Sequence, residues 1–327
     1  MRGTTRHPQE TPLASIVLVS YKNFETTTRP CLESLFNLSE FAELQIIIVD
    51  NASGKETTDK IQELTKDKAN IEFIPNKINR GFPGGANDAA RRASSDIVFF
   101  LDIDTIVPDE ALRKLAGFIE QNPDWIVGPV TNNTGSEQKI FTETKEFAKI
   151  LLEGAEWCKH AKGSVIKVRQ LDFSCIGMKR NILKDVGTLD EGFGLGYYED
   201  TDFCHRAGQK GYPLMMFEEV FIFHKGGGTG LSSKERMREN RKFFLKKHGK
   251  DGNASLLRQR DVNLRAINCY AQMLEYSPVK KEDILYRANN RLHLADHLWP
   301  KNPIKKLLYA GELHAAKKDF QRQGLSL

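Results

Sequence analysis

The sequence has few of the features that mark secreted, zinc-knuckle or membrane-spanning proteins. Its five cysteines are odd in number, widely spaced and never set as a CxxC pair, which argues against a disulfide framework and a zinc knuckle. The first dozen residues are polar and lack the apolar core of a signal peptide. No stretch approaches the roughly 18 apolar residues of a membrane span. We therefore expect a cytoplasmic protein with reduced cysteines.

Two common phosphate-binding motifs are also missing. No GxGxxG follows the first predicted strand, as a dinucleotide-binding fold would require, and no GxxxxGK[ST] is present. The loop after the first strand lacks the glycine-rich, Arg- and Lys-bearing sequence expected of sugar nucleotidyltransferases. These absences exclude a P-loop enzyme and disfavour a nucleotidyltransferase.

What is present is an alternation of short β-branched runs with segments of helical periodicity. Strands are predicted at 15–20, 45–49, 71–74, 97–101 and 126–130, and helices at 26–38, 57–64, 85–93 and 109–120, the last capped by the acidic residues after Pro108. A glycine-rich loop is predicted at 79–85. This order is typical of an α/β fold with a mostly parallel sheet flanked by helices.

The second half of the chain gives a weaker signal. We predict mixed loop and helix at 131–169, a strand at 171–178, a helix at 199–210, two short strands at 214–223 and helices beyond residue 232. The predicted organisation is a polar extension at 1–12, a nucleotide-binding α/β domain at 13–230 and a helical C-terminal region at 231–327.

Positive charge is concentrated at the start of that helical region. The formal net charge is only +5, and we expect no nucleic-acid partner. Between residues 234 and 261, however, ten Lys or Arg stand against four Asp or Glu. Such a helix can contact an anionic membrane surface or a phosphate-rich acceptor, or it can simply be a solvated face.

The acidic triplet Asp102-Ile103-Asp104 ends the apolar run at 97–101. Carboxylates just past a strand can face the crevice at the carboxyl edge of a sheet, where open α/β sheets bind ligands. Oxygen ligands there suit Mg²⁺ or Mn²⁺ that bridges a diphosphate. The triplet alone is a weak signal, because acidic pairs also arise as turn residues.

Two upstream loops should open onto the same edge. Ser20 and Tyr21 follow the first strand, and Asp50 follows the second. The Asp50 carboxylate can accept a hydrogen bond from the ring N–H of a pyrimidine, and Tyr21 can lie against the base. Alternatively, Asp50 forms an Asx turn or a helix cap.

Several of these motifs, in this order, resemble the family-2-type inverting glycosyltransferases with the GT-A fold. The resemblance covers roughly residues 13–230 and depends on the segments Ser15 to Tyr21, Ile48 to Ser53, Asn79 to Asn87, Asp102 to Asp104, Glu199-Asp200 and His224.

The resemblance assigns a role to each motif. It implies that Asp50 holds the nucleobase, that Asp102 contacts the ribose or the metal, and that Asp104 binds Mn²⁺ or Mg²⁺. His224 would be a further metal ligand. The remaining nucleotide-binding residues would be Ser20, Tyr21, Asn79, Gly81 and Asn87.

The resemblance also implies the chemistry. Asp200 would be the general base that deprotonates an acceptor hydroxyl, and Glu199 would bind or orient the acceptor. Gly177, in the strand beneath the donor sugar, would leave room for a pyranose ring, although a strand glycine can also mark a bulge. The expected partners are a nucleotide-diphosphate sugar and a glycan or lipid-linked acceptor. A non-catalytic nucleotide-sugar- or glycan-binding protein and a sugar nucleotidyltransferase stay open as alternatives.

Overall fold

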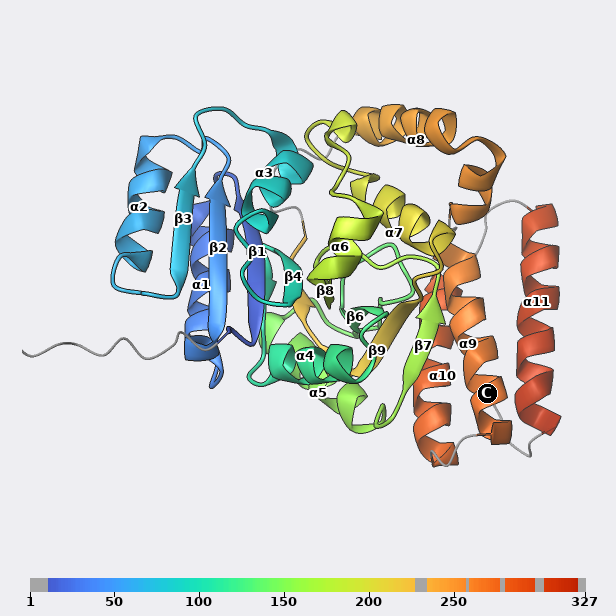
Figure 1. Ribbon diagram of the computed structural model, residues 1–327. Helices are drawn as coiled ribbons and strands as arrows, with labels where there is room; N and C mark the ends of the chain where they lie inside the picture. The colour runs from blue at the N-terminus through green and yellow to red at the C-terminus, as the bar shows by residue number, and fades with distance from the viewer. Residues whose placement is uncertain (1–10, 227–233, 257–258, 277–279, 298–302, 323–327) are drawn as a thin grey trace, which may run out of the picture.

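A single mixed sheet of eight strands forms the centre of the protein (Figure 1). The computed structural model describes residues 11–226, 234–256, 259–276, 280–297 and 303–322. Along the sheet the strand order is β3-β2-β1-β4-β8-β6-β9-β7. Six strands share one direction: β1 (Ala14–Ser20), β2 (Leu44–Asp50), β3 (Ile71–Pro75), β4 (Ile97–Asp102), β6 (Ile126–Val130) and β9 (Leu214–Phe221). Antiparallel to their neighbours are β7 (Val165–Val168) and β8 (Cys175–Lys179). The predicted mostly parallel α/β sheet is confirmed.

Alternate residues of the buried strands supply two hydrophobic clusters. In β1, Ile16 and Leu18 join one cluster, while Val17 and Val19 join the other. The first cluster is completed by α1 (Arg29–Phe36), α2 (Lys55–Thr65) and α4 (Ala111–Gln121). The second is completed by α3 (Gly81–Ala90), α5 (Phe147–Lys159), α6 (Arg180–Val186) and α7 (Glu199–Gln209). Strands buried on both faces explain the continuous apolar runs in the sequence.

In the described part of the chain, four helical elements follow the sheet: α8 (Lys234–Ser255), which is kinked at Gly249, α9 (Gln259–Tyr276), α10 (Lys281–His297) and α11 (Pro303–Arg322). Figure 1 shows α9, α10 and α11 beside the β7 edge of the sheet. Among the described residues, no helix combines the length and the apolar character needed to cross a bilayer. The predicted boundary at residue 230 lies outside the described residues, as does most of the 1–12 extension.

A buried ionic group joins these helices to the sheet. Glu218 of β9 accepts from Arg287 Nη1 at 2.7 Å, from the Tyr270 hydroxyl at 2.5 Å and from the Ser164 hydroxyl at 2.5 Å. Glu218 and Arg287 are both fully buried. Since Ile267 and Ile284 also belong to the second hydrophobic cluster, the sheet and the C-terminal helices share one core.

Several local predictions need correction. The predicted loop at 79–85 is short, because α3 begins at Gly81. The residue before α4 is Glu110 in a left-handed conformation without a side-chain cap, and Asp109 instead accepts from the Ser39 N–H at 2.7 Å. The strand predicted at 171–178 is β8, which starts only at Cys175 because 171–174 form the loop into it.

Other differences concern elements that the sequence did not resolve. A π-helix at Phe24–Thr28 precedes α1. The segment 131–169 contains α5 and β7. Where two short strands were predicted at 214–223, the single strand β9 occupies 214–221, and β10 (Phe223–His224) begins only at the last residue of that range. It pairs with β5 (Thr105–Ile106), which was not predicted, and forms a small separate ribbon.

Candidate active site

The carboxyl ends of the parallel strands lie side by side, and the predicted site residues follow them. The β1–β2 register pairs Ser20 with Asp50, and the β1–β4 register pairs Val19 with Asp102. Because β8 runs antiparallel to β4, the residues that precede β8, including Asp172, reach the same edge. This is the edge at which open α/β sheets bind ligands.

Asp102, Asp104 and His224 form a compact group at this edge. One ligand atom from each lies within 4.8 Å of the other two. His224 Nε2 is 3.2 Å from Asp104 Oδ1 and 3.7 Å from Asp102 Oδ2. The ribbon of β5 and β10 produces this geometry, because its register pairs His224 with Thr105, the residue after Asp104. The three predicted ligands therefore lie together, although they come from two distant parts of the chain.

The imidazole of His224 is held so that Nε2 faces the carboxylates. Its Nδ1 lies 2.7 Å from the carbonyl oxygen of Asn133, and because a carbonyl only accepts, Nδ1 must carry a proton. The Asn132 side chain accepts from the His224 N–H at 2.9 Å and donates to the His224 carbonyl at 3.0 Å. Histidines that bind metals are commonly fixed in this way by a hydrogen bond to the other ring nitrogen. Sequence reasoning missed both asparagines, whose only signal was their position directly after a parallel strand.

The pKa values in this group reflect crowded negative charge. Burial and the neighbouring charge of Asp104 raise the pKa of Asp102 well above its ordinary value. Burial alone would lower the pKa of His224, but its hydrogen bond with Asp104 and the charges of both aspartates raise it to about 10. The pocket therefore favours positive charge between the carboxylates, which is the electrostatic requirement of a cation site.

Glu199 and Asp200 begin α7 in the part of the site nearest Asp172. Asp200 Oδ1 accepts from the Thr201 N–H at 2.6 Å and from the Thr201 hydroxyl at 3.2 Å, and Gln170 Nε2 donates to Oδ2 at 3.4 Å. Burial and the charge of Asp172 raise the pKa of Asp200 to about 6, against the lowering effect of these hydrogen bonds. A carboxyl with this pKa is ionised at pH 7 and basic enough to take a proton.

Glu199 is more deeply enclosed than Asp200. It is 8% exposed, and among the described residues its Oε2 has no hydrogen-bond partner. Burial and the charge of Asp200 raise its pKa well above the ordinary value. A buried carboxyl oxygen without a partner can bind a hydroxyl group of a ligand.

Asp172 is the acidic residue that sequence reasoning did not select. Its Oδ2 accepts from the Thr134 hydroxyl at 2.8 Å and its Oδ1 from the Ser174 N–H at 2.8 Å. Its charge raises the pKa of both Asp102 and Asp200, so it lies close to the metal-ligand group and to the start of α7. The sequence did contain a signal, because an aspartate opens the segment 172–178. That segment was considered only for Gly177, so Asp172 was overlooked.

The residues predicted to bind the nucleotide have internal partners. The Asp50 carboxylate accepts from the Ser53 hydroxyl, from the Ser53 N–H at 3.3 Å and from the Thr58 hydroxyl at 2.8 Å. This is the Asx-turn arrangement that the sequence left open, and it uses three of the roughly four lone-pair positions of a carboxylate. The Ser20 hydroxyl lies 2.9 Å from that of Thr28. Tyr21 is partly buried, with Lys22 Nζ 5.0 Å from its ring centre.

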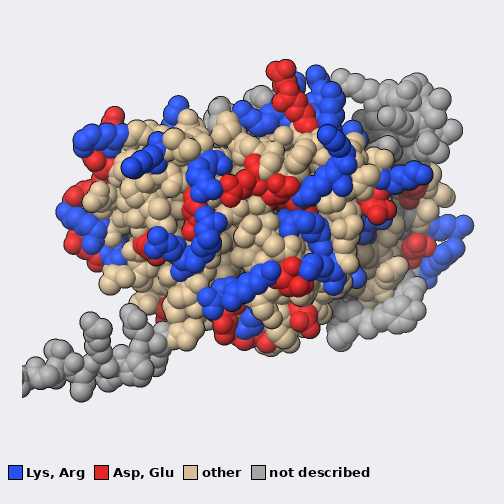
Figure 2. All heavy atoms as spheres, turned by 45° about the horizontal axis from the view of Figure 1, so that its top comes forward, with Lys and Arg blue, Asp and Glu red and all other residues tan. Residues whose placement is uncertain are grey.

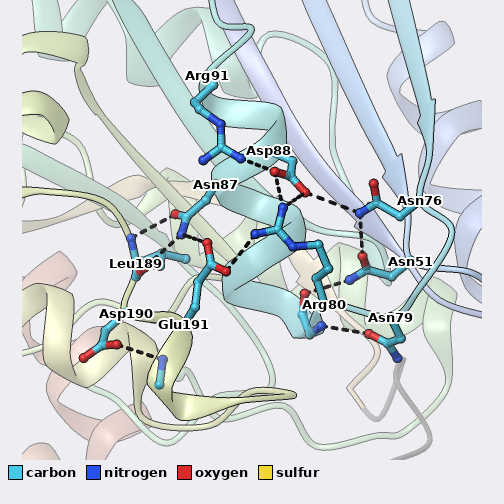
Figure 3. A network of polar contacts seen from close by, with 12 residues as sticks. Asn51, Asn76, Asn79, Arg80, Asn87, Asp88, Arg91, Leu189, Asp190 and Glu191 are labelled. Atoms are coloured by element: carbon cyan, nitrogen blue, oxygen red, sulfur yellow. Dashed lines mark hydrogen bonds and ion pairs between the residues drawn. The ribbon is translucent and has the colours of Figure 1, made fainter.

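The segment 79–87 belongs to a polar network shown in Figure 3. Asn79 Oδ1 accepts from the Gly81 N–H at 2.8 Å, which fixes the start of α3. Asn87 donates to the Leu189 carbonyl at 2.9 Å and accepts from the Leu189 N–H at 3.0 Å, so its amide joins α3 to the segment 189–191. Arg80 pairs with Asp88 and, at 2.8 Å, with Glu191.

Gly81 is required by a close approach. Its φ is +71°, and a Cβ there would lie 2.0 Å from the carbonyl oxygen of Gly194. At this glycine the backbone of α3 therefore packs directly against the backbone of the loop that leads to α7.

The argument for Gly177 as a sugar-contacting residue does not hold. It lies in β8 opposite Phe99, and a Cβ there would be 2.2 Å from the Phe99 ring and 2.9 Å from Ile119. The missing side chain makes room for core residues and leaves no space for a pyranose.

Comparisons with known proteins identify the family of the chain. The model of the glycosyl transferase family 2 matches residues 15–187 of the 327. A poly-beta-1,6-N-acetyl-D-glucosamine synthase from Staphylococcus epidermidis is 29% identical over 210 residues, which are 62% of this chain and 46% of that protein. A poly(ribitol-phosphate) beta-glucosyltransferase from Bacillus spizizenii is 33% identical over 135 residues, 40% of this chain and 21% of that protein. The chain thus spans less than half the length of these relatives.

Two solved structures share the fold. GalNAc-T7 with UDP, GalNAc and Mn²⁺ superposes with a TM-score of 0.55 at 14% identity, covering 86% of this chain and 54% of that one. The mannosyltransferase PcManGT from Pyrobaculum calidifontis, in complex with GDP-Man and Mn²⁺, gives 0.50 at 14% identity, with 94% and 76% covered. At this identity the likeness concerns the fold alone. Because the family model matches more than half of the chain, this protein belongs to glycosyl transferase family 2, and its fold is of the GT-A type.

Proposed function

We propose that the protein is an inverting glycosyltransferase that transfers a sugar from a nucleoside-diphosphate donor to an acceptor hydroxyl with the help of Mn²⁺ or Mg²⁺. One observation carries the proposal: the group of Asp102, Asp104 and His224 lies at the same sheet edge as the carboxylates of Glu199 and Asp200. A cation site next to a separate basic carboxylate is what transfer from a diphosphate donor requires.

Three residues would hold the cation. Asp104 and His224 would bind it directly, and Asp102 would bind it directly or through water. Two carboxylates and an imidazole are ligands that Mn²⁺ accepts readily, and the Asn133 carbonyl already fixes the imidazole with Nε2 toward them. When bound, the cation neutralises the charge that develops on the leaving diphosphate.

Asp200 would accept the proton in the transfer step. The acceptor oxygen forms a bond to the anomeric carbon while the bond from that carbon to the diphosphate oxygen breaks. The proton of the acceptor hydroxyl moves to the Asp200 carboxylate, and the nucleoside diphosphate leaves with the electron pair. Attack from the face opposite the leaving group inverts the anomeric centre in one step. Glu199, with one oxygen unpartnered, would orient the acceptor.

The nucleotide would lie along the ends of β1 to β4. Asp50 retains one lone-pair position for the ring N–H of a base, and Tyr21 follows β1 next to it. Asn79, Gly81 and Asn87 would shape this side of the site through the start of α3. Both curated relatives are named for polymers, a poly-N-acetylglucosamine and a poly(ribitol-phosphate), which favours a glycan or lipid-linked acceptor.

The exposed basic side chains of α8 are the proposed contact with an anionic membrane surface, at its cytoplasmic face. They are Lys234, Arg238, Arg241, Lys242, Lys246 and Lys250. Figure 2 shows basic side chains around a strip of acidic ones on this side of the molecule. Vesicles with anionic lipid should retain the protein at low salt and release it at high salt. Equal retention by neutral vesicles would contradict this contact.

Release of nucleoside diphosphate from UDP-, GDP- and dTDP-sugars tests the reaction. A transferase releases the diphosphate when acceptor is present, and Mn²⁺ but not chelator supports this release. Asp96→Ala, which removes an exposed acidic side chain from the opposite end of β4, is the matched control for Asp104→Ala. Donor binding without release would favour a binding protein. Pyrophosphate release from a nucleoside triphosphate and a sugar phosphate would favour a nucleotidyltransferase.

A further inference from the structure

Helix α8 packs its inner face on the residues that lead into α7. Asn240, Phe244, Lys247 and His248 form this face, which the family model, ending at residue 187, does not include. The ring of Phe244 is buried and lies 5.9 Å from that of Tyr198. The opposite face of the same helix carries exposed residues such as Glu235.

Asn240 binds three carbonyl groups of the loop before α7. Its Nδ2 donates to the oxygens of Phe193 at 2.9 Å, Gly196 at 2.8 Å and Tyr197 at 2.9 Å. An amide nitrogen has two hydrogens, so at least one of them is shared between carbonyls. The Phe193 carbonyl also accepts from the Gly196 N–H at 3.5 Å, whereas for the Gly196 and Tyr197 carbonyls the buried Asn240 amide is the donor that the described residues supply.

The loop that Asn240 holds is strained. Tyr197 and Tyr198 have φ of +76° and +75°, in the left-handed region that residues with a side chain seldom adopt. Each such residue costs on the order of 1–3 kcal/mol and persists only where the surroundings enforce it. Since Tyr198 is the residue directly before α7, this backbone sets where the helix starts and which way Glu199 and Asp200 point.

A second contact of α8 fixes α7 itself. Asp202, fully buried, pairs with Lys247 at 2.6 Å and His248 at 2.7 Å from α8, and with Arg206 at 2.8 Å. Burial would raise the pKa of Asp202, but these three hydrogen bonds outweigh it and lower the pKa. Lys247 also binds Asp190 at 2.7 Å. Both ends of the 190–202 segment are therefore attached to α8.

We infer that Asn240 is a positioning residue for the base. By holding the carbonyls of Gly196 and Tyr197, it keeps the strained turn in place and thereby aims the Asp200 carboxylate at the acceptor hydroxyl. This inference rests on the proposed function, in which Asp200 takes the proton. If α8 only had to shield this loop from water, an apolar residue at position 240 would be enough. The three carbonyl oxygens instead need a hydrogen-bond donor, which Asn240 provides.

The test is Asn240→Asp, which keeps the shape but cannot donate. Misplacement of a catalytic group by about 1 Å costs on the order of 10²-fold in rate, so we expect kcat to fall by roughly 10- to 100-fold. The donor Kd should stay within about 2-fold. Glu235→Ala, on the outer face of α8, is the control and should leave kcat unchanged. If Asn240→Asp does not fold, Asn240→Ala, which also cannot donate and adds no charge, replaces it with the same expectation.

A double-mutant cycle separates positioning from general stability. In an Asp200→Asn background the Asn240 substitution should lower kcat by less than about 3-fold, because the group that it positions is gone. Equal losses in both backgrounds, or native kcat in Asn240→Asp, would overturn the inference. Hydrogen exchange of the amides from 197 to 202 should accelerate in Asn240→Asp whatever the reaction is. Unchanged exchange would refute the claim that Asn240 restrains the loop before α7. Near-native turnover in Asp200→Asn would refute only the role of Asp200 as the base.

Discussion

Replacing Asp200 by Asn should remove transfer and stabilise the fold at the same time. The pKa of Asp200 is raised from 3.8 to about 6, so the folded protein disfavours its charged form. Each pKa unit corresponds to about 1.4 kcal/mol, which gives a cost of up to about 3 kcal/mol for the carboxylate near pH 7. The Asn oxygen can still accept from Thr201, and only the 3.4 Å contact from Gln170 is lost. We therefore expect a net stabilisation of about 1–3 kcal/mol.

The pH dependence follows from the sign of this shift. Because the folded-state pKa lies above the unfolded value, the cost is absent below about pH 4 and complete above about pH 6. Urea unfolding in the presence of chelator should show a larger gain for Asp200→Asn at pH 7.5 than at pH 5. Turnover by the native protein should fall as the pH drops through about 6, since the base is then protonated.

Transfer by Asp200→Asn should fall by about 10²- to 10⁴-fold, the usual contribution of a positioned base, with donor affinity nearly unchanged. If Asp200 only caps α7, its replacement should instead cost about 0.5–2 kcal/mol of stability and leave activity in the folded fraction. Turnover, donor affinity and unfolding free energy measured on one preparation decide between these outcomes. Near-native turnover would refute the role of Asp200 as the general base. A loss of stability would refute the claim that the charge of Asp200 destabilises the folded protein.

Three further changes test other parts of the structure. Asp104→Ala should abolish the difference in donor affinity between Mn²⁺ and chelator, measured by titration; a persistent difference would remove this residue from the metal site. Gly81→Ala should destabilise the protein by about 1–3 kcal/mol, because its left-handed backbone and the nearby loop carbonyl admit no Cβ. Chemical unfolding measures this, and native stability would contradict the packing described. Arg287→Met should cost about 1.5–3 kcal/mol because it removes the nearer of the two arginines that pair with buried Glu218, leaving Arg291 at 3.7 Å, and the added change Glu218→Leu should recover part of that loss.

The sequence predicted the elements whose signals are local. The strands and helices of the first half have strong periodicity, and the acidic residues Asp102 and Asp104 mark the end of an apolar strand clearly. Asp200 was selected through the family resemblance, which matches the acidic pair at the start of a clear helix. In these cases the chain segment that shows the pattern is also the segment that forms the structure.

The missed features depend on partners far away in the chain. Asn132 and Asn133 matter only because β10 lies beside them, and β5 and β10 are two residues each, too short for any periodicity. Gly177 was misinterpreted because the space beside it depends on Phe99 in the neighbouring strand. The contact of Asn240 with the loop before α7 likewise joins segments whose individual sequences give no sign of each other.

The ribbon of β5 and β10 has a consequence for how the protein is made. His224 follows Asp104 by more than a third of the chain, and only the pairing of two short strands brings them together. On a ribosome, the two aspartates emerge long before the histidine does, and closing so long a loop must await the strands in between. A nascent chain that ends before β10 offers a divalent cation only two of the three side chains. The proposed three-residue site is therefore completed only once β10 has been synthesised.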